Sequence, residues 1–322
     1  MEKANVYFTN MRVKAFGENL LGKLEKLMRK AGIEQIDFKD RFAAIKIHFG
    51  EYGNLSFLRP NFARTVAEEV KRLGGRPFLT DCNTLYVGSR KHALEHIETA
   101  YRNGFTPYST GCHIIIGDGL KGTDEVAVPV PNGEYVKEAK IGRAVMDADI
   151  FISLNHFKGH EMTGFGGAIK NIGMGCGSRA GKMEQHCDGK PTVNQEHCIG
   201  CRNCARICAH DAPVFNNKKA TIDHSKCVGC GRCIGVCPKD AIEPSWGQAE
   251  GLVDKKMAEY ALAVVNGRPH FHISIVMDVS PFCDCHPEND APIVPNVGMF
   301  ASFDPVALDQ ALSLIHISEP TR

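Results

Sequence analysis

The chain has 322 residues, 43% of them hydrophobic, and 38 Lys and Arg against 37 Asp and Glu give it a formal net charge of +1. That balance excludes a global electrostatic attraction to nucleic acid or to a membrane surface, and no apolar run approaches the ~18 residues that a membrane span requires. The first ten residues lack the basic and apolar regions of an export signal, so we expect a cytoplasmic protein.

The first half of the chain alternates short apolar runs with amphipathic stretches. We predict strands at 5–8, 43–48, 76–80, 114–117 and 149–155, and helices at 18–30, 60–73, 90–103 and 141–148. Glycines follow three of these helices, where helix C-caps belong. Strands that alternate with helices predict an α/β fold with a mostly parallel sheet and flanking helices.

Polar side chains gather where the predicted strands end. In open α/β sheets, ligands bind outside the carboxyl ends of the strands. The candidate ligand-binding or catalytic residues at these ends are His48, Asp81, His156, Lys158 and His160. Each one alone is equally explained as a loop or turn residue, so the prediction depends on several strand ends agreeing. An ordinary imidazole titrates near neutral pH, which makes His48 or His160 a reasonable proton donor.

A glycine-rich stretch follows, from 164 to 182, and contains the candidate residues Lys170 and Asn171. We predict a loop whose backbone N–H groups converge on an anion, with Lys170, Arg179 or Lys182 supplying charge. The spacing matches neither the P-loop nor the dinucleotide fingerprint. The alternative is a flexible loop that packs one part of the chain against another.

Two copies of one cysteine pattern come next. Cys198, Cys201, Cys204 and Cys208 read C-x-x-C-x-x-C-x-x-x-C, and Cys227, Cys230, Cys233 and Cys237 repeat that spacing, with Pro238 closing the second copy. This is the bacterial ferredoxin run, in which the fourth cysteine ligates the other cluster. We therefore assign Cys198, Cys201, Cys204 and Cys237 to one [4Fe–4S] cluster, and Cys227, Cys230, Cys233 and Cys208 to a second. Zinc sites usually use separated C-x-x-C pairs, and disulfide scaffolds belong to small secreted chains, so both alternatives are disfavoured.

Beyond the repeat the α/β pattern resumes, with a helix at 248–266, a strand at 271–277 and a helix that starts at Asp304. The economical interpretation is one α/β host in two parts, 1–187 and 245–312, interrupted by a ferredoxin-like α+β module at 188–244. Two consecutive separate domains are the alternative. Residues 313–322 look like a translated sequencing adaptor, and we leave them out of the fold prediction.

A second pair of cysteines lies outside the repeat. Cys283 and Cys285 are separated by one residue, so both could face one metal from a turn, and His286 could add a nitrogen ligand. Free, inert thiols are the alternative.

Two further motifs carry a family resemblance. The stretch from Lys158-Gly-His160 to Lys170-Asn171-Ile-Gly173, with Asp304-Pro-Val-Ala-Leu-Asp309 near the end, resembles the family catalogued as domain of unknown function 362. The match is closest to its branch of uncharacterised Fe–S centre proteins, which carry an inserted pair of [4Fe–4S] motifs. The resemblance implies cluster binding in cytoplasmic, often anaerobic, hosts, and it implies no settled reaction.

These observations support two hypotheses about function. The first is an oxidoreductase, in which two [4Fe–4S] clusters relay electrons to or from a small molecule held at the strand ends. The second is a non-enzymatic electron carrier or assembly factor that docks on a larger redox partner protein. A cluster-based sensor is a third possibility, but the sequence has no helix-turn-helix or basic patch to act on DNA. The substrate and the reaction do not follow from the sequence.

Overall fold

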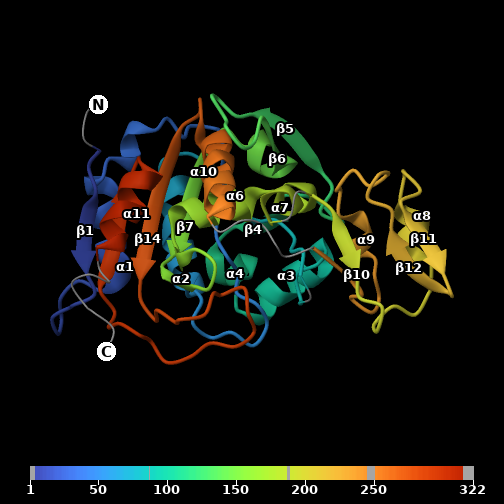
Figure 1. The fold of residues 1–322 in the computed structure, drawn as a ribbon. Helices are drawn as coiled ribbons and strands as arrows, with labels where there is room; N and C mark the ends of the chain where they lie inside the picture. Colours follow the sequence, from blue (N-terminus) through green and yellow to red (C-terminus); the bar gives the residue numbers. More distant parts are fainter. Residues whose placement is uncertain (1–3, 87, 187–188, 245–250, 315–322) are drawn as a thin grey trace.

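The computed structural model describes residues 4–86, 88–186, 189–244 and 251–314. A seven-stranded sheet runs through the larger part of the molecule, which we call the α/β part and which comprises the described residues up to 186 and from 251 (Figure 1). Its strands, in spatial order, are β1 (Tyr7–Asn10), β15 (Gly298–Ser302), β14 (His270–Val276), β7 (Ile150–His156), β2 (Phe42–Lys46), β3 (Arg76–Asp81) and β4 (His113–Ile116). The five strands from β14 to β4 are parallel, whereas β15 is antiparallel to both of its neighbours. The predicted α/β fold with a mostly parallel sheet is confirmed.

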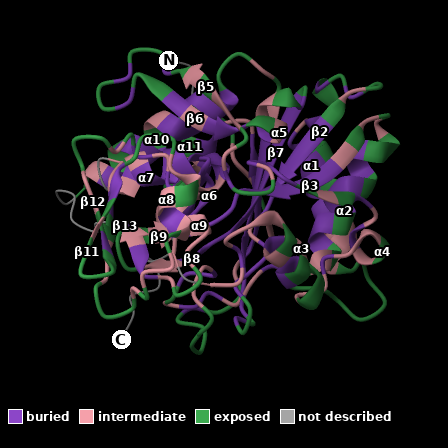
Figure 2. Cartoon of the chain, turned by 90° about the vertical axis from the view of Figure 1, so that its right-hand side faces the viewer, coloured by how far each residue is buried: buried purple, intermediate pink, exposed green. Residues whose placement is uncertain are grey.

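Helices cover both faces of this sheet. On one face lie α1 (Leu20–Lys30), α2 (Pro60–Arg72), α3 (Ala93–Arg102) and α4 (Pro107–Thr110); on the other lie α5 (Arg143–Asp147), α6 (Ala168–Cys176), α10 (Leu252–Val265) and α11 (Pro305–Ser313). Successive residues of a strand pack into the apolar clusters on opposite faces of the sheet. Ile150 and Ile152 of β7 pack with α1 and α2, whereas Phe151 packs with α10. Figure 2 shows β2, β3 and β7 as buried strands between these helices. Burial on both faces explains why these strands read as nearly continuous apolar runs.

Residues 189–244 form a small lobe at one end of the α/β part (Figure 1). It contains the strand pair β10 (Pro191–Val193) and β13 (Ile242–Pro244), the hairpin β11 (Pro213–Asn216) and β12 (Lys219–Ile222), and the short helices α8 (Asn203–Ile207) and α9 (Arg232–Gly235). Because β10 and β13 pair with each other, the chain enters and leaves the lobe at the same place.

The two cysteine runs of the small lobe have matching backbones. Gly200 and Gly229 occupy equivalent positions and have φ of 69° and 73°, and Arg202 and Gly231 have φ of 63° and 65°. These are left-handed conformations that most side chains avoid, so their recurrence at the same offset is not accidental. The lobe is therefore built from two copies of one cysteine-bearing unit.

The glycine-rich stretch is not a loop, and this prediction was wrong. It forms β9 (Gly164–Gly166), which pairs with β8 (Lys158–His160), and then the helices α6 and α7 (Arg179–His186). A Cβ at Gly173 would lie 2.2 Å from the carbonyl oxygen of Met257 in α10, and one at Gly181 would lie 2.3 Å from the carbonyl oxygen of Lys140. These glycines allow α6 to pack closely on α10 and α7 to pack closely on β6 (Glu138–Gly142), which local sequence preference cannot show.

Three further boundaries differ from the predictions. The predicted helix at 141–148 is strand β6 (Glu138–Gly142) followed by the short α5, and β6 pairs with β5 (Glu125–Pro129), which was not predicted. Strand β15 was also missed. Some predicted boundaries lie outside the described residues: the helix start at 248, the module boundaries at 187–188 and 245, and the tail from 315. Among the described helices, none combines the length and apolarity needed to cross a bilayer.

Candidate cluster cavities and the adjoining pocket

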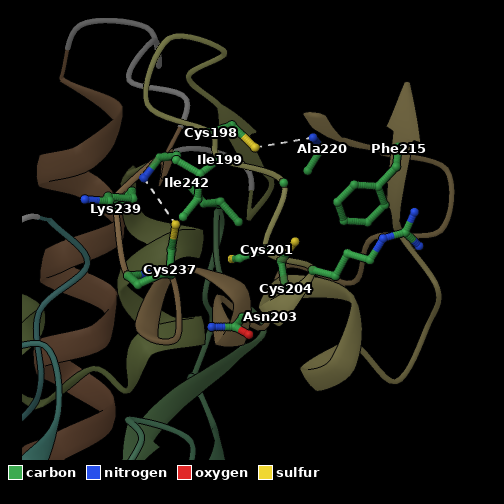
Figure 3. Close-up of a pocket in the computed structure, with 14 residues that line it drawn as sticks. Cys198, Ile199, Cys201, Asn203, Cys204, Phe215, Ala220, Cys237, Lys239 and Ile242 are labelled. Atoms are coloured by element: carbon green, nitrogen blue, oxygen red, sulfur yellow. Dashed lines mark hydrogen bonds between the residues drawn. The ribbon is translucent and has the colours of Figure 1, made fainter. Parts of the chain in front are cut away.

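A first cavity in the small lobe is lined by Cys198, Cys201, Cys204 and Cys237 (Figure 3). The Sγ of Cys198 accepts a hydrogen bond from the backbone N–H of Ala220 at 3.4 Å, and the Sγ of Cys237 accepts one from Ala241 at 3.3 Å. Such N–H···S bonds stabilise the thiolate form that a metal cluster needs. Four sulfurs around one space, two of them already hydrogen-bonded, fit the ligand set of an iron–sulfur cube.

A second cavity in the same lobe is lined by the remaining cysteines of the repeat, Cys208, Cys227, Cys230 and Cys233. Each cavity thus takes three cysteines from one run and the fourth from the other run, which is the grouping that the crossed assignment requires. Burial, and then the charges of Cys230 and Cys227, raise the pKa of Cys233 to about 12. The four cysteines of this cavity would therefore be thiolates only when a bound cation, such as iron, displaces their protons.

A much larger cavity, of about 750 Å³, lies in the α/β part beyond the carboxyl ends of the parallel strands. Six of the seven predicted ligand-binding or catalytic residues line it: His48, Asp81, Lys158, His160, Lys170 and Asn171. His156 does not line it. Three further cations that sequence reasoning did not place among the strand-end candidates also line it: Lys46, Arg90 and Lys182. This cavity, hereafter the pocket, is the size of a small-molecule site.

Lys46 is the least expected of these residues, because it lies inside a buried strand and is fully shielded from solvent. Its Nζ lies 3.0 Å from Oδ1 of Asp81 and donates a hydrogen bond of 2.8 Å to Oδ1 of Asn171. Burial alone would raise the pKa of Asp81, but the charges of Lys46 and His96 hold that pKa well below its usual value. An ionisable residue inside an apolar run was the signal that could have identified Lys46 from the sequence.

Arg90 is also fully buried and joins the segment 48–51 to the segment 86–90 at the wall of the pocket. Its guanidinium donates to Oε2 of Glu51 at 3.0 Å, to the hydroxyl of Tyr86 at 2.8 Å and to Nε2 of His48 at 3.0 Å. The other ring nitrogen of His48 lies 3.0 Å from the backbone nitrogen of Gly50, and because a neutral imidazole has a single acceptor nitrogen, His48 accepts only one of these two bonds at a time. Burial and the charge of Arg90 lower the pKa of His48 well below its usual value. The argument for His48 as a proton donor that titrates near neutral pH therefore fails.

His156 lies outside the pocket and holds other side chains in place. Its Nδ1 lies 2.9 Å from the carboxylate of Asp284, and its Nε2 lies 2.8 Å from the carbonyl oxygen of Met277. Both partners are acceptors, so both bonds form when both ring nitrogens carry a proton. Lys158 lies 3.0 Å from the other carboxylate oxygen of Asp284. His156 and Lys158 together anchor the turn that carries Cys283 and Cys285.

That turn brings the second cysteine pair to the pocket. Cys285 lines the pocket, Cys283 is buried behind it, and Nζ of Lys170 lies 3.0 Å from Sγ of Cys283. The nitrogen ligand nearest to the two sulfurs comes from His160, with the three atoms within 4.8 Å of one another. The predicted third partner, His286, instead bonds Glu161 at 3.2 Å.

Helix α6 positions Lys170 and Asn171 through a cap from the far end of the chain. The carboxylate of Asp309 accepts hydrogen bonds from the backbone N–H groups of Ala168 at 2.7 Å and Ile169 at 2.8 Å. A negative side chain at a helix N-terminus satisfies otherwise unpaired donors and complements the helix dipole. The last residue of the Asp304–Asp309 motif thus fixes the helix that lines the pocket.

The pocket and the first cysteine cavity are neighbours. In β13, Ile242 lines the cavity and the next residue, Glu243, lines the pocket. Leu85, which also lines the pocket, packs in one apolar cluster with Met183 of α7 and Cys204 of the first cavity. One strand and one apolar layer separate the two spaces.

Comparison with known proteins places the chain in a family. The model of the domain-of-unknown-function family DUF362 matches residues 43–313. The chain belongs to this family. Over 39 residues it is also 46% identical to the B subunit of the anaerobic dimethyl sulfoxide reductase of Haemophilus influenzae, a match that covers 12% of this DUF362 protein and 19% of that subunit.

Two solved structures resemble the chain at low similarity. The lactate racemase apoprotein from Thermoanaerobacterium thermosaccharolyticum gives a TM-score of 0.48 at 11% identity, over 90% of this chain and 55% of that one. A protein from Thermotoga maritima gives 0.46 at 14% identity, over 92% and 57%. The chain thus spans little more than half the length of either. At these values neither structure indicates a ligand or a reaction for this DUF362 protein.

Proposed function

We propose that this DUF362 protein binds two [4Fe–4S] clusters in the two cysteine cavities and transfers electrons between them and a small molecule held in the pocket. The observation that carries the proposal is the crossed grouping of cysteines, three from one run and one from the other around each cavity. The short match to a subunit of an anaerobic reductase supports it. In this scheme the small lobe is a ferredoxin-like module inserted into the α/β host, and its paired strands β10 and β13 form the connection.

The clusters would supply single-electron transfer, and the remaining roles belong to side chains. Cys198, Cys201, Cys204 and Cys237 hold one cluster, and Cys208, Cys227, Cys230 and Cys233 hold the other. Ile242 and Phe215 shield the first cavity from water, which influences the potential of a cluster.

The charges of the pocket favour a ligand with a negative group near Lys182. Lys46, Arg90 and Lys158 each have a carboxylate partner at 3.0 Å. Lys182 is buried, and its ammonium donates to the carbonyl oxygens of Gly177 at 2.6 Å and Gly175 at 3.4 Å. Carbonyl partners do not neutralise a buried positive charge, so a carboxylate or phosphate of the ligand would bind there.

Anaerobic reconstitution tests the clusters. About eight irons and eight sulfides per chain are expected. The crossed ligation, in which the fourth cysteine of each run binds the other cluster, is tested in the triple variant Cys198→Ser, Cys201→Ser, Cys204→Ser, which should retain about four irons. Adding Cys237→Ser to that chain should change nothing, whereas adding Cys208→Ser should remove the remaining cube. Cys112→Ser, at a buried thiol of the α/β core, is the matched control. The opposite result for Cys237 and Cys208 would refute the crossed ligation, and zinc in place of iron would refute cluster binding.

Native mass spectrometry of anaerobically purified protein tests the ligand. A retained small anion should be present in the wild type, absent from Lys182→Met and present in Lys121→Met, where the lysine is exposed. Iron content should be equal in all three. Iron and sulfide alone, with no turnover of any small molecule, would favour a carrier.

The carrier alternative has one observation in its favour. Ile199 lines the first cavity and Val228 the second, and these equivalent residues are 60% and 57% exposed. Apolar side chains exposed beside each cavity would suit docking of a redox partner protein. Replacing both by Ser should then slow electron exchange with a partner while leaving the pocket ligand bound.

A further inference from the structure

The turn at Cys283–Asp284–Cys285 holds two sulfurs side by side at the wall of the pocket. The backbone N–H of Cys285 donates to Sγ of Cys283 at 3.4 Å, which folds the two side chains onto the same side of the turn. Between them, Asp284 is fully buried and is fixed by His156 and Lys158. Cys283 is 1% exposed, whereas Cys285 faces the pocket. The pair is thus rigidly placed, with one sulfur accessible and the other covered.

The hydrogen bonds around the pair disfavour a metal ion, although His160 and the two sulfurs are close enough to hold one. The Nδ1 of His160 accepts from the backbone N–H groups of Met162 at 3.2 Å and Thr163 at 3.3 Å. The proton of the neutral ring therefore lies on Nε2, the nitrogen that a metal would otherwise use. The ammonium of Lys170, 3.0 Å from Sγ of Cys283, already supplies that sulfur with a cation.

The same contacts favour a thiolate beside a thiol. Burial alone would raise the pKa of Cys283, but the hydrogen bond from Cys285 and the charge of Lys170 hold that pKa well below its usual value. The hydrogen bond to the Cys283 thiolate and burial raise the pKa of Cys285 well above its usual value. One proton is therefore shared between two adjacent sulfurs, the arrangement from which a disulfide forms.

We infer that Cys283 and Cys285 are a redox-active pair, which cycles between a dithiol and an intrachain disulfide and exchanges two electrons with the two clusters. This inference rests on the proposed function for its electron source. The S–S bond between Cys283 and Cys285 would break on uptake of two electrons, which the clusters held by the two cysteine runs would supply one each. Cys285 takes one proton from the pocket, and Cys283 remains a thiolate beside Lys170. The reverse step forms the bond, releases that proton and reduces both clusters. The pair would convert single electrons into a pair of electrons at the site where the ligand binds.

Thiol trapping in the anaerobic holoprotein tests this pair. The protein is held with oxidised or dithionite-reduced clusters, denatured in N-ethylmaleimide and digested, and the peptide that carries both cysteines is weighed. We expect no label and a mass two hydrogens lower in the oxidised protein, and two labels in the reduced protein. Cys283→Ser and Cys285→Ser should each leave one thiol that is labelled in both states, with iron content unchanged. The peptide of Cys112 is the internal control.

Four outcomes would overturn the inference. Two labels in both states would show that the thiols do not cycle. One further metal ion per chain, lost in Cys285→Ser, would show a metal site instead. Failure of the chain to take up iron on anaerobic reconstitution would refute both the proposed function and exchange with the clusters, even where dithiothreitol still reduces the pair. Full iron content with an unresponsive pair would refute the inference alone.

Discussion

Replacing Asp284 by Asn should destabilise the protein by about 3–5 kcal/mol, the cost of removing one partner from a buried ion pair. Asp284 is fully buried, and its two oxygens serve His156 at 2.9 Å and Lys158 at 3.0 Å. The neutral amide leaves the ammonium of Lys158, 7% exposed, without its counter-charge. Burial alone would raise the pKa of Asp284, but His156 and Lys158 hold that pKa below its ordinary value of 3.8. Its stabilisation is therefore present above about pH 4 and lost as the pH falls further.

Asp278→Asn is the matched control. Asp278 pairs with Arg59 at 2.8 Å, a shorter distance, but the two side chains are 28% and 56% exposed. Exposed pairs contribute roughly 0–1 kcal/mol, and Asn tolerates the positive φ of 48° at this position. The assay is anaerobic urea unfolding followed by far-UV circular dichroism, with the midpoints compared at pH 7. Equal losses of unfolding free energy in the two variants, or a loss below about 1 kcal/mol for Asp284→Asn, would show that burial does not determine how much this ion pair stabilises the protein.

Three other substitutions test packing, titration and capping. Gly173→Ala should cost about 1–3 kcal/mol, because its Cβ would collide with the carbonyl oxygen of Met257. Gly22→Ala in α1, where a Cβ would meet only the side chain of Glu18, should instead stabilise by roughly 0.5–1 kcal/mol, and thermal melting separates the two signs. Burial raises the pKa of Asp118 to about 6 from 3.8, so this group should lower stability by about 3 kcal/mol as the pH rises from about 4 to about 6. Because burial also raises the pKa of Asp309 to about 6, Asp118→Asn should reduce the slope in melts across this range and leave the part that Asp309 contributes. Asp309→Ala removes the cap of α6 and should lower stability by roughly 0.5–2 kcal/mol in the same melts; an unchanged midpoint would show that the cap contributes nothing.

The strands that the sequence predicted are those whose residues are apolar on both faces. The runs at 43–48, 76–80 and 149–155 became β2, β3 and β7 with shifts of one or two residues. Strand β15 was missed because Gly298–Ser302 is short and has neither alternation nor β-branched residues. It is a strand because β14 and β1 pair with it on both sides. That information lies in residues almost 300 positions apart.

The glycine-rich stretch shows where local preference misleads. Glycine favours a loop when its neighbours in sequence are considered alone. In α6, however, a Cβ at Gly173 would collide with the carbonyl oxygen of Met257, and one at Gly175 would lie 2.5 Å from the side chain of Lys46. A larger residue would push α10 away or displace the ammonium that pairs with Asp81. Tertiary contact therefore overrides helix propensity, and no pattern within the stretch reveals it.

The two kinds of site differ in how far sequence can reach. Three of the four cysteines around each cavity come from seven consecutive residues, so spacing alone brings their sulfurs together. The pocket instead draws Lys46, Asp81, Lys158 and Lys170 from separate strands and a helix. The strand-end rule predicted that such residues converge, but not which of them neutralise one another. Lys182 became a candidate for ligand binding because its partners are carbonyl oxygens and not carboxylates, and only the three-dimensional structure shows which kind of partner each lysine has.

The position of the pocket assigns different tasks to the two clusters under the proposed function. Side chains alternate between the two faces of a strand, so Ile242 points to the first cavity and Glu243 to the pocket, which are separated by β13 and by the apolar layer that contains Leu85. Within the described part of the chain neither cavity shares a lining residue with the pocket, but only the first has a lining residue, Ile242, that is next in sequence to a residue of the pocket. Electrons would therefore enter at the second cluster, beside the exposed Val228, and leave from the first. Cys285 lines the pocket to which Glu243 also contributes, which places the sulfur pair on the same side of β13 as the ligand.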